Sequence, residues 1–292
     1  MNKIRISAAV VGASALAAAM AFTLPAATAA SRSGSPPPAS TQKLTGSMRL
    51  APQIHYRTAL ISRRTVEAGT TTSSNWSGYE ISARPSRTIG RVQAVFNVPS
   101  INCAKSTLGT AGAAVWSQWV GLDGFSDNTV EQTGVGAQCT STTGPATYFG
   151  FNEMFPNPAT TFTGPNPGDA IVVVVQKVSG KWNLVLQDRT TGGTVSTTQA
   201  CPTGSICHDA SGEVITEDFN GAVAGGFNLA DFALDTQTGL AARTGGGVSG
   251  SFASTTAWTS NTIDLANGAD RMATPGPLEG GAAFYLSWNA SK

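Results

Sequence analysis

The chain has 292 residues, of which 41% are hydrophobic and only 12% are charged, and its formal net charge is +1. The charge is unevenly distributed. Residues 1–68 hold eight basic residues and one acid, whereas residues 69–292 hold ten basic and sixteen acidic residues, a formal charge of −6. Nucleic-acid binding depends on basic surfaces, so we expect no nucleic-acid partner for the acidic part of the chain.

Residues 1–29 have the features of a secretory signal peptide. A positively charged start precedes an apolar run at residues 6–24, and Ala27-Thr28-Ala29 supplies the small residues of a cleavage site. A membrane anchor is the alternative, because the apolar run is almost long enough to span a bilayer. Pro25 closes the run before the small residues, which favours cleavage, so we expect a secreted protein that is not held at a membrane.

The next segment, residues 30–68, differs in composition from the rest of the chain. Its first part is rich in Ser, Pro and Ala, which cannot bury enough apolar surface to fold alone. Basic residues then accumulate and end in the pair Arg63-Arg64. We predict a propeptide at residues 30–68 with an approximate boundary, followed by a single folded domain at residues 69–292.

Four cysteines lie in this domain, at Cys103, Cys139, Cys201 and Cys207. An even number of cysteines in a secreted chain indicates disulfides rather than free thiols. Three pairings are open, and free buried thiols are a further alternative. We favour Cys201–Cys207, which closes a short loop containing Pro and Gly, together with Cys103–Cys139.

No stretch after residue 75 has the periodicity of a long amphipathic helix. Short runs of β-branched and aromatic residues alternate with turns such as Asn166–Asp169 and Ser179-Gly180. These runs predict strands at 76–83, 89–98, 113–122, 146–155, 170–178, 181–188, 212–219, 249–258 and 282–288. A series of short strands of this kind indicates an all-β fold, either a β-sandwich or a β-barrel. The sequence shows no internal repeat.

Alternation along the predicted strands sorts side chains by face. Glu153 shares a face with phenylalanines, and Glu213, Ile215 and Glu217 share another. A carboxyl group among apolar neighbours has a raised pKa, which acid–base catalysis by glutamate requires. Glu131 faces away from Gln132, and we expect it to be solvated.

Several kinds of chemistry are excluded by residues that the sequence lacks. His55 and His208 are the only histidines, so neither a His-Glu-x-x-His motif nor a histidine cluster for zinc exists. No Gly-x-Ser-x-Gly elbow and no Asp-Thr-Gly or Asp-Ser-Gly occurs. Carboxylate and amide chemistry remains. Its candidates are Asp123, Glu131, Gln132, Glu153, Glu213, Glu217 and Asp218.

Six segments form an ordered set between residues 74 and 219. They are SNWSG at 74–78, VFNVP at 95–99, WVGLDG at 119–124, QTG at 132–134, YFGFNEMFP at 148–156 and EVITEDF at 213–219. Together they resemble motifs of the glutamic peptidases, the eqolisin family. The resemblance implies a β-sandwich of two large, bent antiparallel sheets, of the concanavalin-like or jelly-roll type, with the active site on the concave face.

The resemblance also implies residue roles and an activity. Gln132 and Glu217 occupy the positions of the catalytic pair. The expected supporting residues are Trp76, Trp119, Asp123, Glu153 and Glu213. Residues 69–292 would then be a secreted acid endopeptidase domain, monomeric, acting on proteins or peptides without a metal or an organic cofactor. Gly136, Phe149 and Phe151 depart from the better-known fungal enzymes, which have acids or Trp there, and this leaves specificity and pH optimum open.

The expected mechanism uses two side chains. Glu217 takes a proton from the attacking water and later gives it to the leaving nitrogen, while the Gln132 amide holds the water and donates to the oxyanion. Two alternatives remain. A glycoside hydrolase could use Glu153 and Glu217 as a carboxylate pair, and a β-sandwich could also serve as a non-catalytic carbohydrate-binding module.

Overall fold

The computed structural model describes residues 69–218, 226–253 and 256–291. The predicted signal peptide (1–29) and propeptide (30–68) lie outside these ranges. The described residues fold entirely as strands and connections. No helix in this part of the chain has the length and apolarity needed to cross a membrane.

Seventeen strands are found in the described ranges. They are β1 (Thr70–Ser73), β2 (Trp76–Ala83), β3 (Ile89–Asn97), β4 (Ala114–Leu122), β5 (Val130–Cys139), β6 (Thr147–Phe155), β7 (Thr160–Phe162), β8 (Ala170–Val178), β9 (Lys181–Asp188), β10 (Thr194–Gln199), β11 (Ser211–Glu217), β12 (Asn228–Leu229), β13 (Leu234–Thr244), β14 (Ser249–Gly250), β15 (Trp258–Asn267), β16 (Asp270–Pro275) and β17 (Phe284–Trp288). All pairings are antiparallel except β1 with β15 and β12 with β4, which are parallel.

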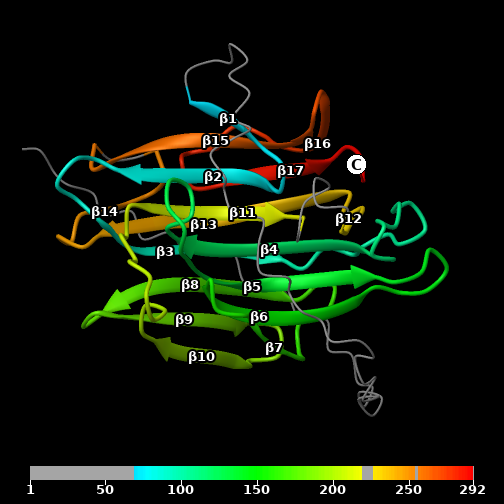
Figure 1. Ribbon diagram of the computed structural model, residues 1–292, viewed down its shortest axis with the longest axis horizontal. Coiled ribbons are helices and arrows are strands. Elements are labelled where there is room, and N and C mark those ends of the chain that lie inside the picture. Colours follow the sequence, from blue (N-terminus) through cyan, green and yellow to red (C-terminus); the bar gives the residue numbers. More distant parts are fainter. Residues whose placement is uncertain (1–68, 219–225, 254–255, 292) are drawn as a thin grey trace, which may run out of the picture. The chain divides into compact units, whose positions relative to one another are not determined.

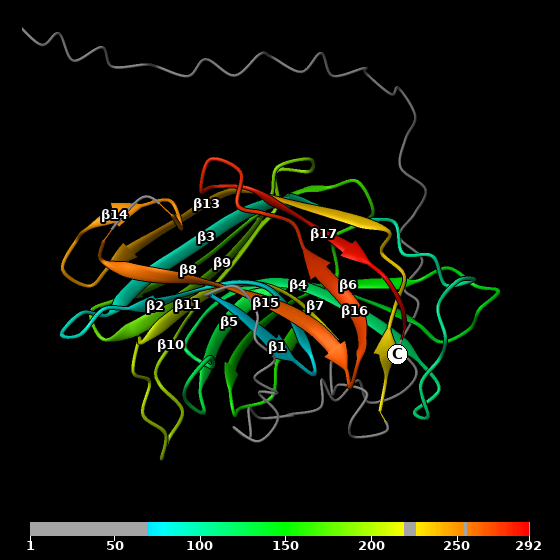
Figure 2. The ribbon, with the colours of Figure 1, turned by 90° about the horizontal axis from the view of Figure 1, so that it is seen from above.

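The strands form two layers that are joined through β15 and β16. One layer has the order β1–β15–β2–β11–β4–β5–β6–β7, and Figure 1 shows it from top to bottom. The other has the order β16–β17–β13–β3–β8–β9–β10. Figure 2 shows the two layers stacked. The prediction of an all-β, antiparallel β-sandwich is confirmed.

The main core lies between the layers. Val120 and Val135 from the first layer belong to the same buried cluster as Val173 and Leu184 from the second. A smaller apolar cluster covers the opposite face of the first layer. Strand β4 is therefore buried at every residue, because one of its faces packs in the core and the other under the second cluster.

Most predicted strands match strands of the structure, namely β2, β3, β4, β6, β8, β9, β11 and β17. The predicted strand at 249–258 is wrong, since only β14 falls inside it and β15 begins at Trp258. The short strands β1, β7 and β12 were not predicted, nor were the longer strands β5, β10, β13, β15 and β16. Gly, Thr and Gln weaken the apolar alternation in these segments, and β13 carries Gly239 with φ 61° at a shift of its register against β3.

The predicted disulfide pairing is confirmed. Cys103 joins Cys139 with a Cα–Cα distance of 5.5 Å, and Cys201 joins Cys207 with a distance of 6.0 Å. The first bond fixes the end of β5 to the segment before β4. No free cysteine remains in the described residues.

The prediction that Glu131 is solvated is wrong. Its side chain is 0% exposed, because the face of β5 opposite Gln132 is the interior of the sandwich. Its cross-strand partners, Leu122 and Met154, belong to the main core. Burial, reinforced by the nearby carboxyl groups of Asp123 and Asp209, raises the pKa of Glu131 to about 10.

Asp235 is another buried acid, on β13, and it makes the stability of the fold dependent on pH. Burial raises its pKa from 3.8 to about 7. Between these pH values the folded state binds more protons than the unfolded state. The stabilisation is therefore complete below about pH 3.8 and is lost as the pH rises toward 7.

We expect Asp235→Asn to reduce the fall in unfolding free energy between pH 4 and pH 7 by up to roughly 4 kcal/mol. Urea unfolding of the wild type and the variant at several pH values measures this slope. The matched control is Asp270→Asn, at an exposed position. Equal slopes for Asp235→Asn and the wild type would contradict the assignment.

Candidate active site

Strand register brings the central polar residues into one row. Gln132 on β5 lies opposite Gly121 on β4 and Glu153 on β6. Gly121 in turn lies opposite Glu213 on β11. Directly paired residues point to the same face of a sheet, so all of these residues share the face opposite the main core.

Gln132 and Glu153 are joined directly. Gln132 Nε2 donates a hydrogen bond to Glu153 Oε2 at 2.7 Å, and both residues are buried. Burial raises the pKa of Glu153 to about 8, the nearby carboxyl group of Glu217 adds to this rise, and the Gln132 bond opposes it. Gln132 Oε1 is buried and has no hydrogen-bond partner among the described residues.

Glu217 ends β11 and keeps part of its surface exposed. Asn75 Nδ2 donates to its Oε1 at 2.9 Å, and Trp119 Nε1 donates to its Oε2 at 2.9 Å. Burial raises the pKa of Glu217 to about 7, although hydrogen bonds from Asn75, Trp119 and Trp76 favour the ionised form. Desolvation therefore outweighs three donors at this carboxyl group.

Two tryptophans form the apolar wall beside Glu217. The rings of Trp76 and Trp119 meet edge to face, with centroids 4.9 Å apart and an angle of 77°. They belong to the smaller apolar cluster. Its other buried members are Val130, Phe149, Phe151, Phe155, Ile215 and Ile263. This cluster keeps water from Glu217 and so causes the rise in its pKa.

Glycines make room for Trp119 on the sheet. A Cβ atom at Gly121 would lie 2.8 Å from Trp119 Cζ3. A Cβ atom at Gly134 would lie 2.5 Å from Trp119 Cβ and 2.2 Å from the carbonyl oxygen of Gln118. Glycine in the Trp-Val-Gly segment therefore leaves room for the indole ring, and glycine in the Gln-Thr-Gly segment leaves room for the Trp119 Cβ atom and the backbone of β4.

Five of the seven residues expected at the site come together, namely Trp76, Trp119, Gln132, Glu153 and Glu217. Of the other two, Glu213 lies in the row of Gln132, on the far side of Gly121, and Asp123 lies outside this row. Asp123 has φ 68° and accepts hydrogen bonds from the backbone N–H groups of Asp209 and Ala210, at 2.7 and 2.6 Å. Glu213 is 0% exposed, and its carboxyl neighbours are Glu80, Asp123 and Asp127.

Asn75 is a site residue that sequence reasoning missed. It lies in the SNWSG segment, and Asn75-Trp76-Ser77 also has the Asn-x-Ser form of an N-glycosylation acceptor. Its side chain is 5% exposed and bonded to Glu217, so it is not accessible to a glycan. The signal that could have identified it is its place directly before Trp76 in a segment shared with the family.

Oxygen atoms of Asp123, Glu131 and Asp209 lie within 4.8 Å of one another. Among the described residues this is the one group of three acids, histidines or cysteines close enough to hold a metal ion. It does not include Glu217 or Gln132. A metal held there would not touch the proposed catalytic pair.

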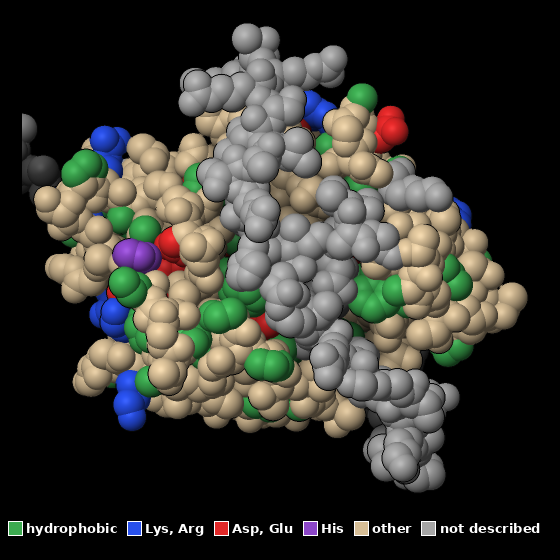
Figure 3. All heavy atoms as spheres, in the orientation of Figure 1, with side chains coloured by type: hydrophobic (Ala, Val, Ile, Leu, Met, Phe, Trp, Pro, Cys, Tyr) green, Lys and Arg blue, Asp and Glu red, His purple; other side chains and the backbone are tan. Residues whose placement is uncertain are grey.

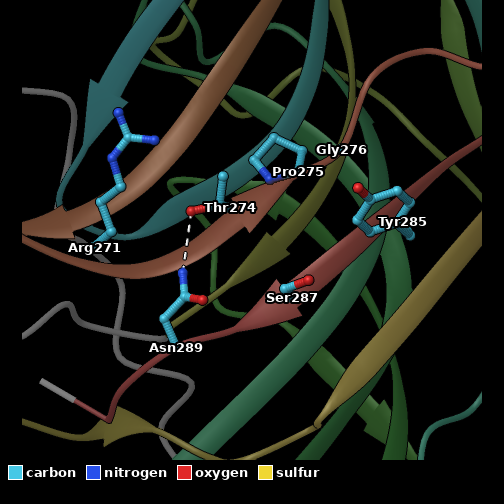
Figure 4. A pocket seen from close by; sticks show the side chains of 7 residues that line it. All are labelled: Arg271, Thr274, Pro275, Gly276, Tyr285, Ser287 and Asn289. Carbon is cyan, nitrogen blue, oxygen red and sulfur yellow. Dashed lines mark hydrogen bonds between the residues drawn. The ribbon is translucent and has the colours of Figure 1, made fainter.

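The pocket in Figure 4 is separate from these residues. It has a volume of about 470 Å³. Its lining comes from β16, which includes Arg271, from β17, which includes Tyr285, and from the residue after each of these strands. None of the expected site residues lines it. Figure 3 shows that charged side chains are sparse on the visible face of the described residues.

The family model of the peptidase A4 family matches residues 74–278. The chain belongs to the peptidase A4 family. This confirms the resemblance to the glutamic peptidases and identifies a hydrolase of peptide bonds, with proteins or peptides as its class of substrate. The glycoside hydrolase and carbohydrate-binding alternatives lose their support. Among curated proteins none matches the chain.

Solved structures of glutamic peptidases share the fold. Scytalido-glutamic peptidase, in complex with a peptide-based transition-state analogue, has a TM-score of 0.59 and 24% identity, covering 74% of this chain and 99% of its own. SCP-B, of the eqolisin family, in complex with a tripeptide, has a TM-score of 0.56, 23% identity and the same coverage. Aspergilloglutamic peptidase from Aspergillus niger has a TM-score of 0.52 and 23% identity, covering 60% of this chain and 99% of its own.

In this A4 peptidase, Gly134→Ala tests the close approach of Trp119. The added methyl group overlaps the backbone of β4, so we expect unfolding free energy to fall by about 3 kcal/mol or more. Urea unfolding measures the loss. Gly193→Ala is the control, because its Cβ would have no neighbour closer than 3.4 Å. Equal stability of the two variants would contradict the packing described.

Proposed function

We propose that this peptidase cuts proteins internally by transferring protons through Glu217 while Gln132 binds the attacking water and the oxyanion. One observation carries the proposal. A partly exposed carboxyl group with a raised pKa lies between indole and amide donors, near a fixed Gln132–Glu153 pair. A carboxyl group that can gain and lose a proton near neutral pH suits acid–base catalysis.

Gln132 has enough free hydrogen-bonding groups to bind both the attacking water and the oxyanion. Its amide carries two N–H groups and one carbonyl oxygen. Glu153 accepts from Nε2, which leaves one N–H group to donate to a developing oxyanion. The Oε1 atom, without a partner in the described residues, can accept from the attacking water. An amide does not titrate, so these roles do not depend on pH.

The raised pKa of Glu217 favours an order of proton transfers different from that expected from the sequence. Below about pH 7 the resting carboxyl group carries a proton. Glu217 then donates this proton to the scissile amide as water attacks the carbonyl carbon, and its carboxylate takes a proton from the water. The products are a carboxylic acid and an amine, and Glu217 is protonated again.

The acid–base group and the oxyanion donor contribute to the rate by different factors. A positioned acid–base group contributes about 10²–10⁴-fold to the rate. One preorganised oxyanion donor contributes about 10²–10³-fold. Trp76, Trp119 and Asn75 would act by setting the pKa and direction of the Glu217 carboxyl group, and Glu153 by holding the Gln132 amide.

We further propose that the protein is a secreted, monomeric zymogen, with a signal peptide at 1–29, a propeptide at 30–68 and a mature domain at 69–292. The two disulfides fit an oxidising compartment. The basic segment before residue 69 complements the acidic domain, and protonation of carboxylates would weaken this attraction. Incubation of the secreted protein from pH 7 to pH 3, with sequencing of the new N-terminus, should show processing near residue 68.

We expect Glu217→Gln to reduce kcat/KM on a denatured protein substrate by at least about 10³-fold, because the proton-transferring group is lost. Gln132→Ala should reduce it by about 10²–10³-fold through loss of the oxyanion donor. Circular dichroism would show that both variants fold. Glu279→Gln, at an exposed glutamate, is the matched control and should retain full activity. An active Glu217→Gln variant would refute the proposed role.

Activity should fall about tenfold per pH unit above about pH 7, because Glu217 loses the proton that it donates. Asn75 donates to the ionised carboxylate, so Asn75→Ala should raise the pKa of Glu217 and move this fall to higher pH. The measurement is the pH dependence of kcat/KM for both proteins. A fall that does not move, or moves to lower pH, would show that another group controls it.

A further inference from the structure

Three acids meet at one end of the sandwich, away from the proposed catalytic pair. Asp123 follows β4, Glu131 is the second residue of β5, and Asp209 precedes β11. Their carboxylate oxygens lie within 4.8 Å of one another. The exposed fractions of these residues are 0%, 0% and 5%, so water does not solvate their charges.

Glu131 is the unusual member of this acidic group. Both of its carboxylate oxygens are buried, and among the described residues no backbone, amide or hydroxyl donor contacts them. The carboxyl group of Asp123 can share a proton with Glu131, but both oxygens of Asp123 already accept backbone N–H groups. A buried acceptor without a donor is costly, and it commonly marks a ligand that completes the site.

The surrounding charges do not balance the acidic group. Lys177 Nζ pairs with Asp209 Oδ2 and lies 4.3 Å from the ring centre of Trp182. Within the described ranges no other ion pair involves these acids. Asp127, in the loop between Asp123 and Glu131, adds a further negative charge. One lysine therefore faces four carboxyl groups.

We propose that Asp123, Glu131 and Asp209 form a binding site for a hard divalent cation of the calcium type. All of the donors are oxygen atoms, which calcium prefers, and neither His nor Cys belongs to the group. Calcium–oxygen distances of about 2.3–2.6 Å place two ligands at most about 5 Å apart, which the observed spacing meets.

The loop between β4 and β5 contains two further oxygen atoms that lack a partner in the described ranges. Asp127 Oδ2 and Thr129 Oγ1 are both buried and lack a partner among the described residues. Asp127 Oδ1 already orders the loop by accepting from the backbone N–H groups of Gly124 and Thr129. Ser126 and Asn128 in the same loop are exposed, so this loop is the part of the chain next to Asp123 and Glu131 that borders solvent.

A cation at this position would act on the proposed function only indirectly. Glu131 directly precedes Gln132 on β5, and the two side chains point to opposite faces of the strand. An ion bound to Glu131 would fix the start of β5 and hence the position of Gln132. The site is thus structural, and its existence does not depend on the catalytic roles proposed above.

Terbium luminescence tests the site without measuring activity. Terbium(III) replaces calcium and emits when a nearby indole is excited, and Trp182 Nε1 donates to Asp209 Oδ1 at 3.1 Å. We expect the purified protein at pH 7 to sensitise terbium emission and calcium to displace the ion. Calcium at millimolar concentration should also raise Tm. Cation ligands must be ionised, so binding at pH 7 has to displace the proton that Glu131 carries there in the absence of the ion.

Two isosteric variants decide the outcome. Glu131→Gln and Asp209→Asn should each weaken terbium binding at least about tenfold and abolish the rise in Tm with calcium. Glu279→Gln, at an exposed glutamate, controls for binding to surface acids and should behave like the wild type. The proposal is overturned if calcium leaves the wild-type Tm unchanged, which would indicate that a proton satisfies Glu131, or if Glu131→Gln binds terbium as tightly as Glu279→Gln.

Discussion

The arrangement of the candidate site depends on the contact between Trp119 and the glycines beside it. Gly121, two residues further along β4, leaves room for the indole ring, and Gly134, opposite Trp119 on β5, leaves room for the Trp119 Cβ atom and the β4 backbone. With the ring in this position, its Nε1 atom reaches Glu217 at 2.9 Å. Glu213 is in register with the row that contains Gln132 and Glu153, and Glu217 lies four residues further along β11. The hydrogen bond from Trp119 directs the carboxyl group of Glu217 toward this row.

The site balances two opposing effects on the Glu217 carboxyl group. Burial beside Trp76 and Trp119 disfavours the charge, while donors from Asn75 and both indoles favour it. Burial without donors would keep the Glu217 carboxyl group protonated, and donors without burial would keep it ionised. A pKa of about 7 results from both together, and this is the property that a group passing protons in both directions needs.

Sequence reasoning predicted the fold class, both disulfides and eight of the seventeen strands, because apolar alternation and cysteine spacing are local signals. It missed β5 and β13, where Gly, Thr and Gln replace the apolar residues that a strand facing a core usually has. The error at Glu131 has a different cause. Alternation correctly separated it from Gln132, but it could not show that both faces of β5 are covered, since that depends on the second layer.

The same limit explains why Asp123 and Glu213 were grouped with the site. Both lie in segments shared with the family, and Glu213 shares a face of β11 with Glu217, so sequence gave no reason to separate them. In the structure Glu213 lies four residues from Glu217 along β11, and its carboxyl neighbours are Glu80, Asp123 and Asp127, although its register places it in the row of Gln132. One set of buried acids keeps a partly exposed member beside neutral donors, whereas the other is closed and short of positive charge. The set that contains Glu217 is suited to exchanging protons with a substrate. The set that contains Glu131 is suited to neutralisation by a proton or by a bound cation.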